Sequence, residues 1–252
     1  MPRLHKKLQR LYVSADLQIG QNVALDKGQS NYLANVLRKN LDDEVVVFNG
    51  REGAWLSRII TLSRKSVVLE CVECFENQPT PADIWYGFAP LKSARLDYVV
   101  QKATEMGVSA MQPVLTHHTQ NNRLKIERIK ANAIEAAEQC EVLNVPDVRP
   151  QISFAALLDN WPKDHAKRVL IVADEEAPAD SPVEILSPLK GMPLGLLIGP
   201  EGGFSTDERA RMLCMDFVMP ISLGPRILRA DTAAVAALAI IQSTIGDWAD
   251  HR

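Results

Sequence analysis

The sequence lacks the features that mark several large classes of protein. No apolar run approaches the roughly 20 residues that span a membrane, and the basic stretch 1–10 has no apolar core of the kind that a secretory signal needs. Four cysteines in 252 residues do not suggest a disulfide scaffold. The single C-x-x-C of Cys71 and Cys74 has no second pair to complete a zinc site. We therefore expect a cytoplasmic protein with reduced cysteines and no bound metal.

The sequence also lacks the strong positive charge of many nucleic-acid-binding proteins, since its net charge is −3. The distribution of charge is more informative than the sum, because the basic residues gather in two short clusters. Such clusters are usually solvated surface, but they are also what contacts to RNA phosphates require. Their members are Arg3, Lys6, Lys7 and Arg10 in the first cluster and Arg123, Lys125, Arg128 and Lys130 in the second.

Residues 194–239 contain two apolar runs that each end in a Gly-Pro turn before a helix start. Residues 194–198 read as a buried parallel strand. The glycines of the following turn allow a positive φ or the close approach of a ligand to the backbone. Ser205 and Glu208 then have the spacing of a capping box, which predicts a helix start at that point.

The second run repeats this order with Phe217, Val218 and Ile221 in a strand and Gly224 in the turn. Asp231 or Thr232 can cap the apolar helix that follows. Because ligands bind outside the carboxyl ends of strands in open α/β sheets, two such turns predict a binding crevice. Neither turn has the G-x-G-x-x-G or P-loop fingerprint of nucleotide-binding sites. Both turns could be purely structural, but the charges of Glu201, Arg226 and Arg229 favour a site.

These two turns resemble the signature motifs of the RsmE-type methyltransferases of the SPOUT superfamily. Residues 199–205 read G-P-E-G-G-F-S, and residues 223–233 read L-G-P-R-I-L-R-A-D-T-A. Residues 92–107 and 135–139 are also similar to segments of that family, whereas Val142 stands where the family commonly has arginine. The family methylates N3 of one uridine in 16S ribosomal RNA. The resemblance implies an α/β SPOUT domain with a mostly parallel sheet and a trefoil knot, S-adenosylmethionine as methyl donor, and a homodimer.

The resemblance also implies roles for individual residues. A fixed guanidinium can stabilise charge that develops on uracil oxygens, so Arg229 is the first catalytic candidate and Arg226 the next. The base that removes the N3 proton remains open between Glu201 and Asp231. Asp231 stands where the family usually has glutamate, and it could equally cap a helix. The expected cofactor-binding residues are Ile198, Gly199, Pro200, Glu201, Gly202, Leu223, Gly224, Ile227 and Leu228.

The chain divides into two expected domains, 1–76 and 80–252, joined by a polar, proline-containing linker. Short strand patterns and the Asn49-Gly50 hairpin signal predict a small β-barrel in the first domain. In the resembled family this domain is PUA-like and binds RNA, although a β domain without an RNA role is an alternative. Strand patterns that alternate with helix patterns at 93–106, 123–143 and 153–160 predict a parallel sheet in the second domain.

Several basic residues are expected to contact RNA. For Lys102, an ion pair with Glu105 one helical turn away is the alternative. The apolar helix expected at 233–248 predicts a homodimer, unless it is buried within one chain. Two other functions stay open: a non-catalytic RNA-binding assembly factor of the ribosome, and a SPOUT enzyme that methylates ribose or another base. The expected RNA-binding residues are Arg3, Lys6, Lys7, Arg10, Arg38, Lys92, Arg95, Lys102 and Arg123.

Overall fold

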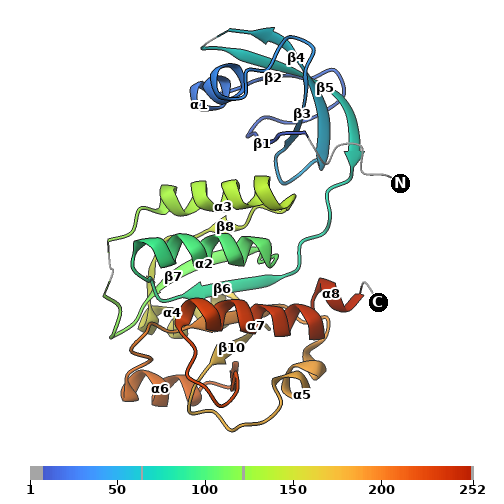
Figure 1. Ribbon diagram of the computed structural model, residues 1–252. Coiled ribbons are helices and arrows are strands. Elements are labelled where there is room, and N and C mark those ends of the chain that lie inside the picture. The colour runs from blue at the N-terminus through green and yellow to red at the C-terminus, as the bar shows by residue number, and fades with distance from the viewer. Residues whose placement is uncertain (1–7, 64, 121–122, 251–252) are drawn as a thin grey trace. The chain divides into compact units, whose positions relative to one another are not determined.

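The computed structural model describes residues 8–63, 65–120 and 123–250 (Figure 1). The chain forms two compact units. The first contains Met1–Thr80 and Ala137–Val145, and the second contains Pro81–Ala136 and Pro146–Arg252. Among the described residues, no helix is long and apolar enough to cross a membrane.

The first unit is built on a 5-stranded sheet in the order β1-β3-β4-β5-β2. β1 and β3 are parallel and the other neighbours are antiparallel. Hydrogen bonding between β1 and β2, which would close the expected barrel, is not present in the described part of this unit. The strands are β1 (Arg10–Tyr12), β2 (Asn22–Ala24), β3 (Glu44–Phe48), β4 (Ala54–Leu62) and β5 (Val67–Glu76).

Strand β3 is buried on both faces, because Val45 and Val47 belong to one apolar cluster while Val46 and Phe48 belong to another. The second of these clusters includes Ala137 and Leu143, which explains why 137–145 groups with this unit. The predicted hairpin after β3 is confirmed. Asn49 Oδ1 accepts hydrogen bonds from the backbone N–H groups of Arg51 and Glu52, at 3.0 and 3.1 Å.

A short helical stretch near residue 30 consists of two segments. α1 (Lys27–Asn31) continues into the π-helical η1 (Tyr32–Val36). Asp26 caps α1, with Oδ1 2.8 Å from Gln29 N. Arg38 follows with φ +52°, a left-handed conformation that few non-glycine residues adopt.

The second unit is built on a 7-stranded parallel sheet in the order β12-β10-β11-β6-β7-β8, with β9 paired to β7. Every pair of neighbours is parallel, which confirms the predicted α/β class. The trefoil knot stays a prediction. The strands are β6 (Ile84–Phe88), β7 (Ala110–Leu115), β8 (Asp147–Val148), β9 (Ile152–Ser153), β10 (Val169–Ala173), β11 (Leu194–Ile198) and β12 (Val218–Ile221).

Helices cover both faces of this sheet (Figure 1). One apolar cluster joins the sheet to α2 (Ser93–Glu105), α3 (Ile126–Cys140), α5 (Pro182–Leu186), η2 (Ser187–Leu189) and α7 (Ala230–Thr244). A second cluster joins the other face to α4 (Phe154–Asp164) and α6 (Thr206–Leu213). The short α8 (Asp247–Asp250) follows α7. The sheet is therefore the middle layer of three, with the carboxyl ends of its strands at one edge.

Candidate functional site: a cleft between two glycine turns

A cleft of about 680 Å³ lies where β10, β11 and β12 end. It contains the two glycine turns, residues 198–204 and 222–230, together with the segment 173–182 that follows β10. The structure therefore brings together every residue that the sequence predicts for cofactor binding. These are Ile198, Gly199, Pro200, Glu201, Gly202, Leu223, Gly224, Ile227 and Leu228.

The first turn is fixed by the predicted capping box of α6. Ser205 Oγ accepts a hydrogen bond from Glu208 N at 3.2 Å, and Glu208 Oε2 accepts one from Ser205 N at 3.0 Å. Gly203 has φ +66°, as a glycine in this turn allows. Gly202 lines the cleft and also packs closely against a neighbouring side chain, since a Cβ there would lie 3.3 Å from His118 Cβ.

The second turn leaves much of its backbone free. Gly224 has φ +103°, and its N–H donates to Ser222 Oγ at 3.3 Å. Among the described residues, the backbone N–H and C=O groups of residues 226–228 form no hydrogen bond. Backbone polar groups need hydrogen-bond partners. Residues 226–228 lie in the lining of the cleft, where a ligand could provide such partners. The turn therefore fits a ligand that is held by main-chain hydrogen bonds, as expected for S-adenosylmethionine.

The third wall of the cleft was not predicted from the sequence. It includes Asp174, Glu175, Glu176 and Asp180. Asp174 is buried and forms an ion pair with Arg209 at 2.9 Å. The signal was available, since this acidic segment directly follows a buried strand and thus lies at the same edge of the sheet. Its negative charge suits a ligand that carries a sulfonium and an ammonium group.

The catalytic candidates lie at this cleft, but not all line it. Arg226, Arg229 and Glu201 do, whereas Asp231 lies beside it in the first turn of α7. Arg229 NH2 is 3.7 Å from Asp231 Oδ2. The side chain of Arg226 has no hydrogen-bond or ion-pair partner in the described part of the chain. Its guanidinium is therefore available to a ligand.

The structure corrects the predicted start of α7, the helix that follows the second turn. Arg229 is the N-cap residue of α7, and it makes no side-chain cap hydrogen bond. Asp231 and Thr232 both lie inside the helix, so neither is its cap. Asp231 Oδ1 instead accepts a hydrogen bond from Thr232 N at 3.0 Å.

The predicted RNA-binding residues are dispersed. Arg3, Lys6 and Lys7 lie outside the described residues. Arg10 is buried and pairs with Glu141 at 3.3 Å, so it does not offer the expected phosphate contact. Its position in β1 beside β3 removes it from the surface.

The remaining basic residues are accessible to different degrees. Arg38, Lys92 and Arg123 are exposed. Lys102 forms the alternative ion pair with Glu105, at 2.7 Å. Arg95 pairs with Glu201 at 3.0 Å, which places it at the cleft.

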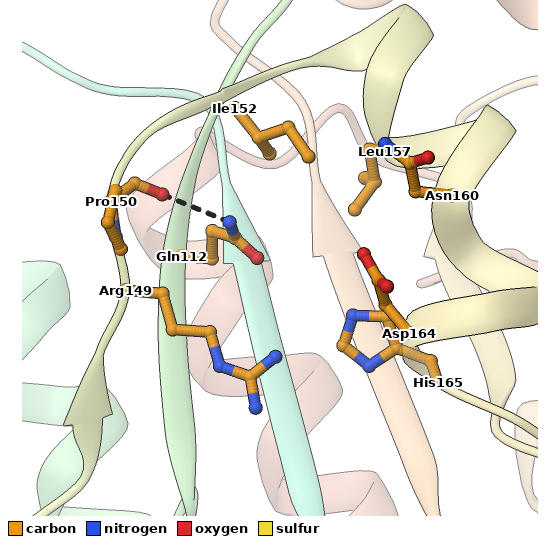
Figure 2. A pocket seen from close by; sticks show the side chains of 8 residues that line it. All are labelled: Gln112, Arg149, Pro150, Ile152, Leu157, Asn160, Asp164 and His165. Carbon is orange, nitrogen blue, oxygen red and sulfur yellow. Dashed lines mark hydrogen bonds between the residues drawn. The ribbon is translucent and has the colours of Figure 1, made fainter.

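A second cavity, of about 220 Å³, lies between β7, the segment after β8, and α4 (Figure 2). It shares no lining residue with the glycine-turn cleft. Gln112 of β7 lines it and donates from Nε2 to Pro150 O at 3.0 Å. His165 lines the opposite side. Its ring stacks on that of Trp161, with ring centroids 4.1 Å apart. Burial, helped by the positive charges of Arg149 and Arg168, lowers the pKa of His165 to about 4.

The described cysteines are all free thiols. Within 8–63, 65–120 and 123–250, no three His, Cys, Asp or Glu side chains are grouped as metal ligands. The adjacent rings of His117 and His118 are arranged edge to face, with their centroids 4.9 Å apart.

Comparison with known proteins matches the chain to two families. Residues 78–242 match the RNA methyltransferase domain family, and residues 25–71 match the RNA methyltransferase PUA domain family. A ribosomal RNA small subunit methyltransferase E from Synechocystis is 31% identical and covers 94% of this chain and 78% of its own length. The enzyme of the same name from Buchnera aphidicola is 29% identical over 97% of this chain and 96% of its own.

Solved structures agree with the sequence relatives. The ribosomal RNA small subunit methyltransferase E of Neisseria gonorrhoeae, bound to S-adenosyl methionine, superposes with a TM-score of 0.83. It is 28% identical, and the match covers 94% of this chain and 97% of that one. The match to the RNA methyltransferase domain spans more than half of the sequence. The chain therefore belongs to the family of ribosomal RNA small subunit methyltransferase E.

Proposed function

We propose that this protein methylates N3 of a specific uridine in the 16S ribosomal RNA of the small subunit, with S-adenosylmethionine as methyl donor. One observation carries the proposal: two glycine turns with family motifs enclose one cleft, and the backbone groups of residues 226–228 there have no partner among the described residues. Relatives that carry the name ribosomal RNA small subunit methyltransferase E support the substrate class.

Donor binding rests on main-chain groups and on the acidic wall. Residues 226–228 offer N–H and C=O groups to the polar edges of the donor. Glu175 lines the cleft and has no ion-pair partner within the described residues, so its charge can complement the positive charges of the donor. S-adenosylmethionine, when bound, supplies a methyl group activated by the sulfonium.

Transfer to uridine N3 forms an N–CH₃ bond and breaks the S–CH₃ bond, and the N3 proton must leave to a base. Arg229, and next Arg226, stabilise the charge that develops on the uracil oxygens. Glu201 or Asp231 accepts the proton. Because both arginines stand on the turn that also holds the donor, the target base is aligned with the methyl group.

RNA binding involves both parts of the chain. We assign a PUA-like RNA-binding domain to 1–76 and the knotted SPOUT domain to 80–252. The exposed residues Arg38, Lys92 and Arg123 are the remaining candidates for phosphate contacts. The enzyme acts as a homodimer in the cytoplasm and needs no metal for this chemistry.

Two other functions are distinguished by experiment. Small subunits from cells that lack the gene are incubated with the protein and isotope-labelled S-adenosylmethionine, and the RNA is digested to nucleosides for mass spectrometry. Labelled N3-methyluridine is expected. Label on ribose or on another base would instead identify a SPOUT enzyme of different specificity. If calorimetry finds no donor binding and no label is transferred, the protein is a non-catalytic assembly factor.

A further inference from the structure

Arg95 connects the two glycine turns. It lies in the first turn of α2, far from both turns in sequence, and its side chain is 39% exposed. Its NH1 group is 3.0 Å from Glu201 Oε1 in the first turn. Its Nε is 4.0 Å from Asp231 Oδ2, at the start of the helix that follows the second turn.

Asp231 extends this connection to a catalytic candidate. The same Oδ2 atom that faces Arg95 is 3.7 Å from Arg229 NH2. The Asp231 side chain is only 16% exposed, and Thr232 N donates to its other oxygen. Glu201, Arg95, Asp231 and Arg229 therefore form a row of alternating charges whose formal sum is zero.

We infer that Arg95 is a positioning residue of the methyl-transfer reaction, rather than a phosphate contact, and that it acts on Arg229 through Asp231. The inference rests on the proposed function. Arg95 carries one of the positive charges in the row, and both of its carboxylate partners belong to the protein. In this arrangement Asp231 faces two guanidinium groups, at 3.7 and 4.0 Å, and Glu201 contacts one at 3.0 Å, so Arg95 lies beside both candidates for the base.

The contribution of Arg95 is to geometry more than to stability. Ion pairs with this degree of exposure contribute little to the stability of a protein. A small displacement of a catalytic group, in contrast, slows a reaction by up to about 100-fold. The Nε and NH1 groups of arginine diverge, and here they face different carboxylates. Lysine ends in one compact ammonium group, which does not reproduce the divergent, planar donor geometry of the guanidinium.

The test combines Arg95→Gln, Arg95→Lys, Asp231→Asn and the double variant Arg95→Gln/Asp231→Asn. Arg211→Gln is the matched control. Arg211 is also 39% exposed, pairs with one carboxylate, Asp159, and lies in the same unit but outside the cleft. For each protein we would measure melting temperature, donor affinity by calorimetry, RNA affinity at several salt concentrations, and the single-turnover rate with donor and RNA saturating.

Arg95→Gln is expected to slow the single-turnover rate by about 10- to 100-fold. Arg95→Lys should recover only part of this loss. RNA affinity and its salt dependence should stay within about twofold of wild type. Because both residues act through Arg229, the double variant should be little slower than the slower single variant. Arg211→Gln should react at the wild-type rate.

Other results would overturn the inference. A loss of RNA affinity, with a salt slope smaller by about one and an unchanged saturated rate, would make Arg95 a phosphate contact. Rate losses that multiply in the double variant would show that Arg95 and Asp231 act independently. If wild type methylates RNA and Arg95→Gln is equally fast, only this inference fails. A wild-type protein that neither binds donor nor methylates RNA would contradict the proposed function as well. Arg95→Lys and Asp231→Asn keep the test decisive if Arg95→Gln does not fold.

Discussion

Arg229 NH2 lies 3.7 Å from Asp231 Oδ2, and the two side chains differ in exposure, at 60% and 16%. Asp231 is thus the fixed member of the pair, held in the first turn of α7, while the guanidinium of Arg229 keeps most of its surface accessible at the cleft. A guanidinium with one protein contact and free donors can engage a substrate oxygen without unfolding its surroundings.

Replacing Arg229 by lysine should slow methyl transfer by about 100- to 1,000-fold, because the charge is kept but the planar donor pair is lost. An exposed ion pair contributes at most about 1 kcal/mol, so the melting temperature should stay near that of wild type. Donor affinity should also change little. The rate is measured in single turnover on small-subunit RNA.

Arg226→Lys is the comparison variant, since Arg226 lines the same turn without a side-chain partner in the described part of the chain. A larger loss of rate in Arg226→Lys than in Arg229→Lys would reverse the order of the two candidates. A near-normal rate in Arg229→Lys would exclude a catalytic role for its guanidinium. A joint fall in melting temperature and donor affinity would mean that Arg229 only braces the turn.

Donor affinity should depend on the conformation of Gly224. Its φ of +103° is unfavourable for any residue with a Cβ, although no atom lies within 4 Å of the place where that Cβ would stand. In Gly224→Ala the turn must therefore change its backbone, and the affinity for S-adenosylmethionine should fall by about tenfold or more. The fold should persist, because the neighbouring residues 226–228 make no hydrogen bonds among the described residues.

Gly191→Ala is the matched control. Gly191 has φ +81° and equally open surroundings, but it lies outside the cleft. The Gly191→Ala variant should have the same local backbone strain but should bind S-adenosylmethionine with wild-type affinity in calorimetry. Equal affinities for the two variants would remove the second turn from the donor site. Gly202→Val is less informative, because its side chain would press on His118.

The sequence pattern correctly predicted those helices, strands and turns that depend on residues close together in the chain. A buried strand was expected at 194–198, and β11 is Leu194–Ile198. Gly107, with φ +75°, follows α2 as a helix terminator. The capping box of Ser205 and Glu208 was readable because both of its hydrogen bonds join residues three apart. The two glycine turns were placed at one site because the carboxyl ends of parallel strands share an edge.

Contacts between distant segments were not predictable in this way. Arg95 reads as a surface cation, yet it pairs with Glu201, 106 residues away. The burial of Arg10 beside Glu141 likewise depends on residues 137–145 joining the first unit. No periodicity in the sequence reports such a contact, since it is the fold that brings the two partners together.

Stability should fall on mild acidification because of His165. This side chain is 9% exposed, and its folded-state pKa is lowered to about 4, against about 6.5 in the unfolded chain. Between these values the unfolded state binds a proton that the folded state does not. The contribution of neutral His165 is thus present above pH 6.5 and is lost as pH falls toward 4. Linkage predicts a loss of roughly 2 kcal/mol between pH 7 and pH 5.

Denaturant unfolding, followed by tryptophan fluorescence at pH 7 and pH 5, measures this loss. Trp85 and Trp161 contact the His165 ring and report on its surroundings. His165→Gln does not titrate, so its stability should depend less on pH. An equal dependence in both proteins would assign the acid sensitivity to carboxylates elsewhere.

The assembly state should depend on α7. One face of this helix is buried within the chain through Ala233, Ala237, Leu238 and Ile241. The other face is also apolar but remains partly accessible. Its residues are Val235, Ala236, Ala239 and Ile240, and Trp248 follows in α8 with 46% exposure. A helix that is apolar on both faces is usually buried on both, so we expect a homodimer that covers the second face.

Ala236→Arg places a charge on that second face without entering the core of the chain. Light scattering should give twice the mass of one chain for wild type and the mass of one chain for Ala236→Arg. Ala155→Arg, at an exposed position of α4, is the control and should remain dimeric. Circular dichroism should show the same helix content in all three proteins, because a desolvated arginine disfavours association rather than folding. A wild-type protein with the mass of one chain at micromolar concentration would contradict the homodimer, and a dimeric Ala236→Arg would place the interface on another surface.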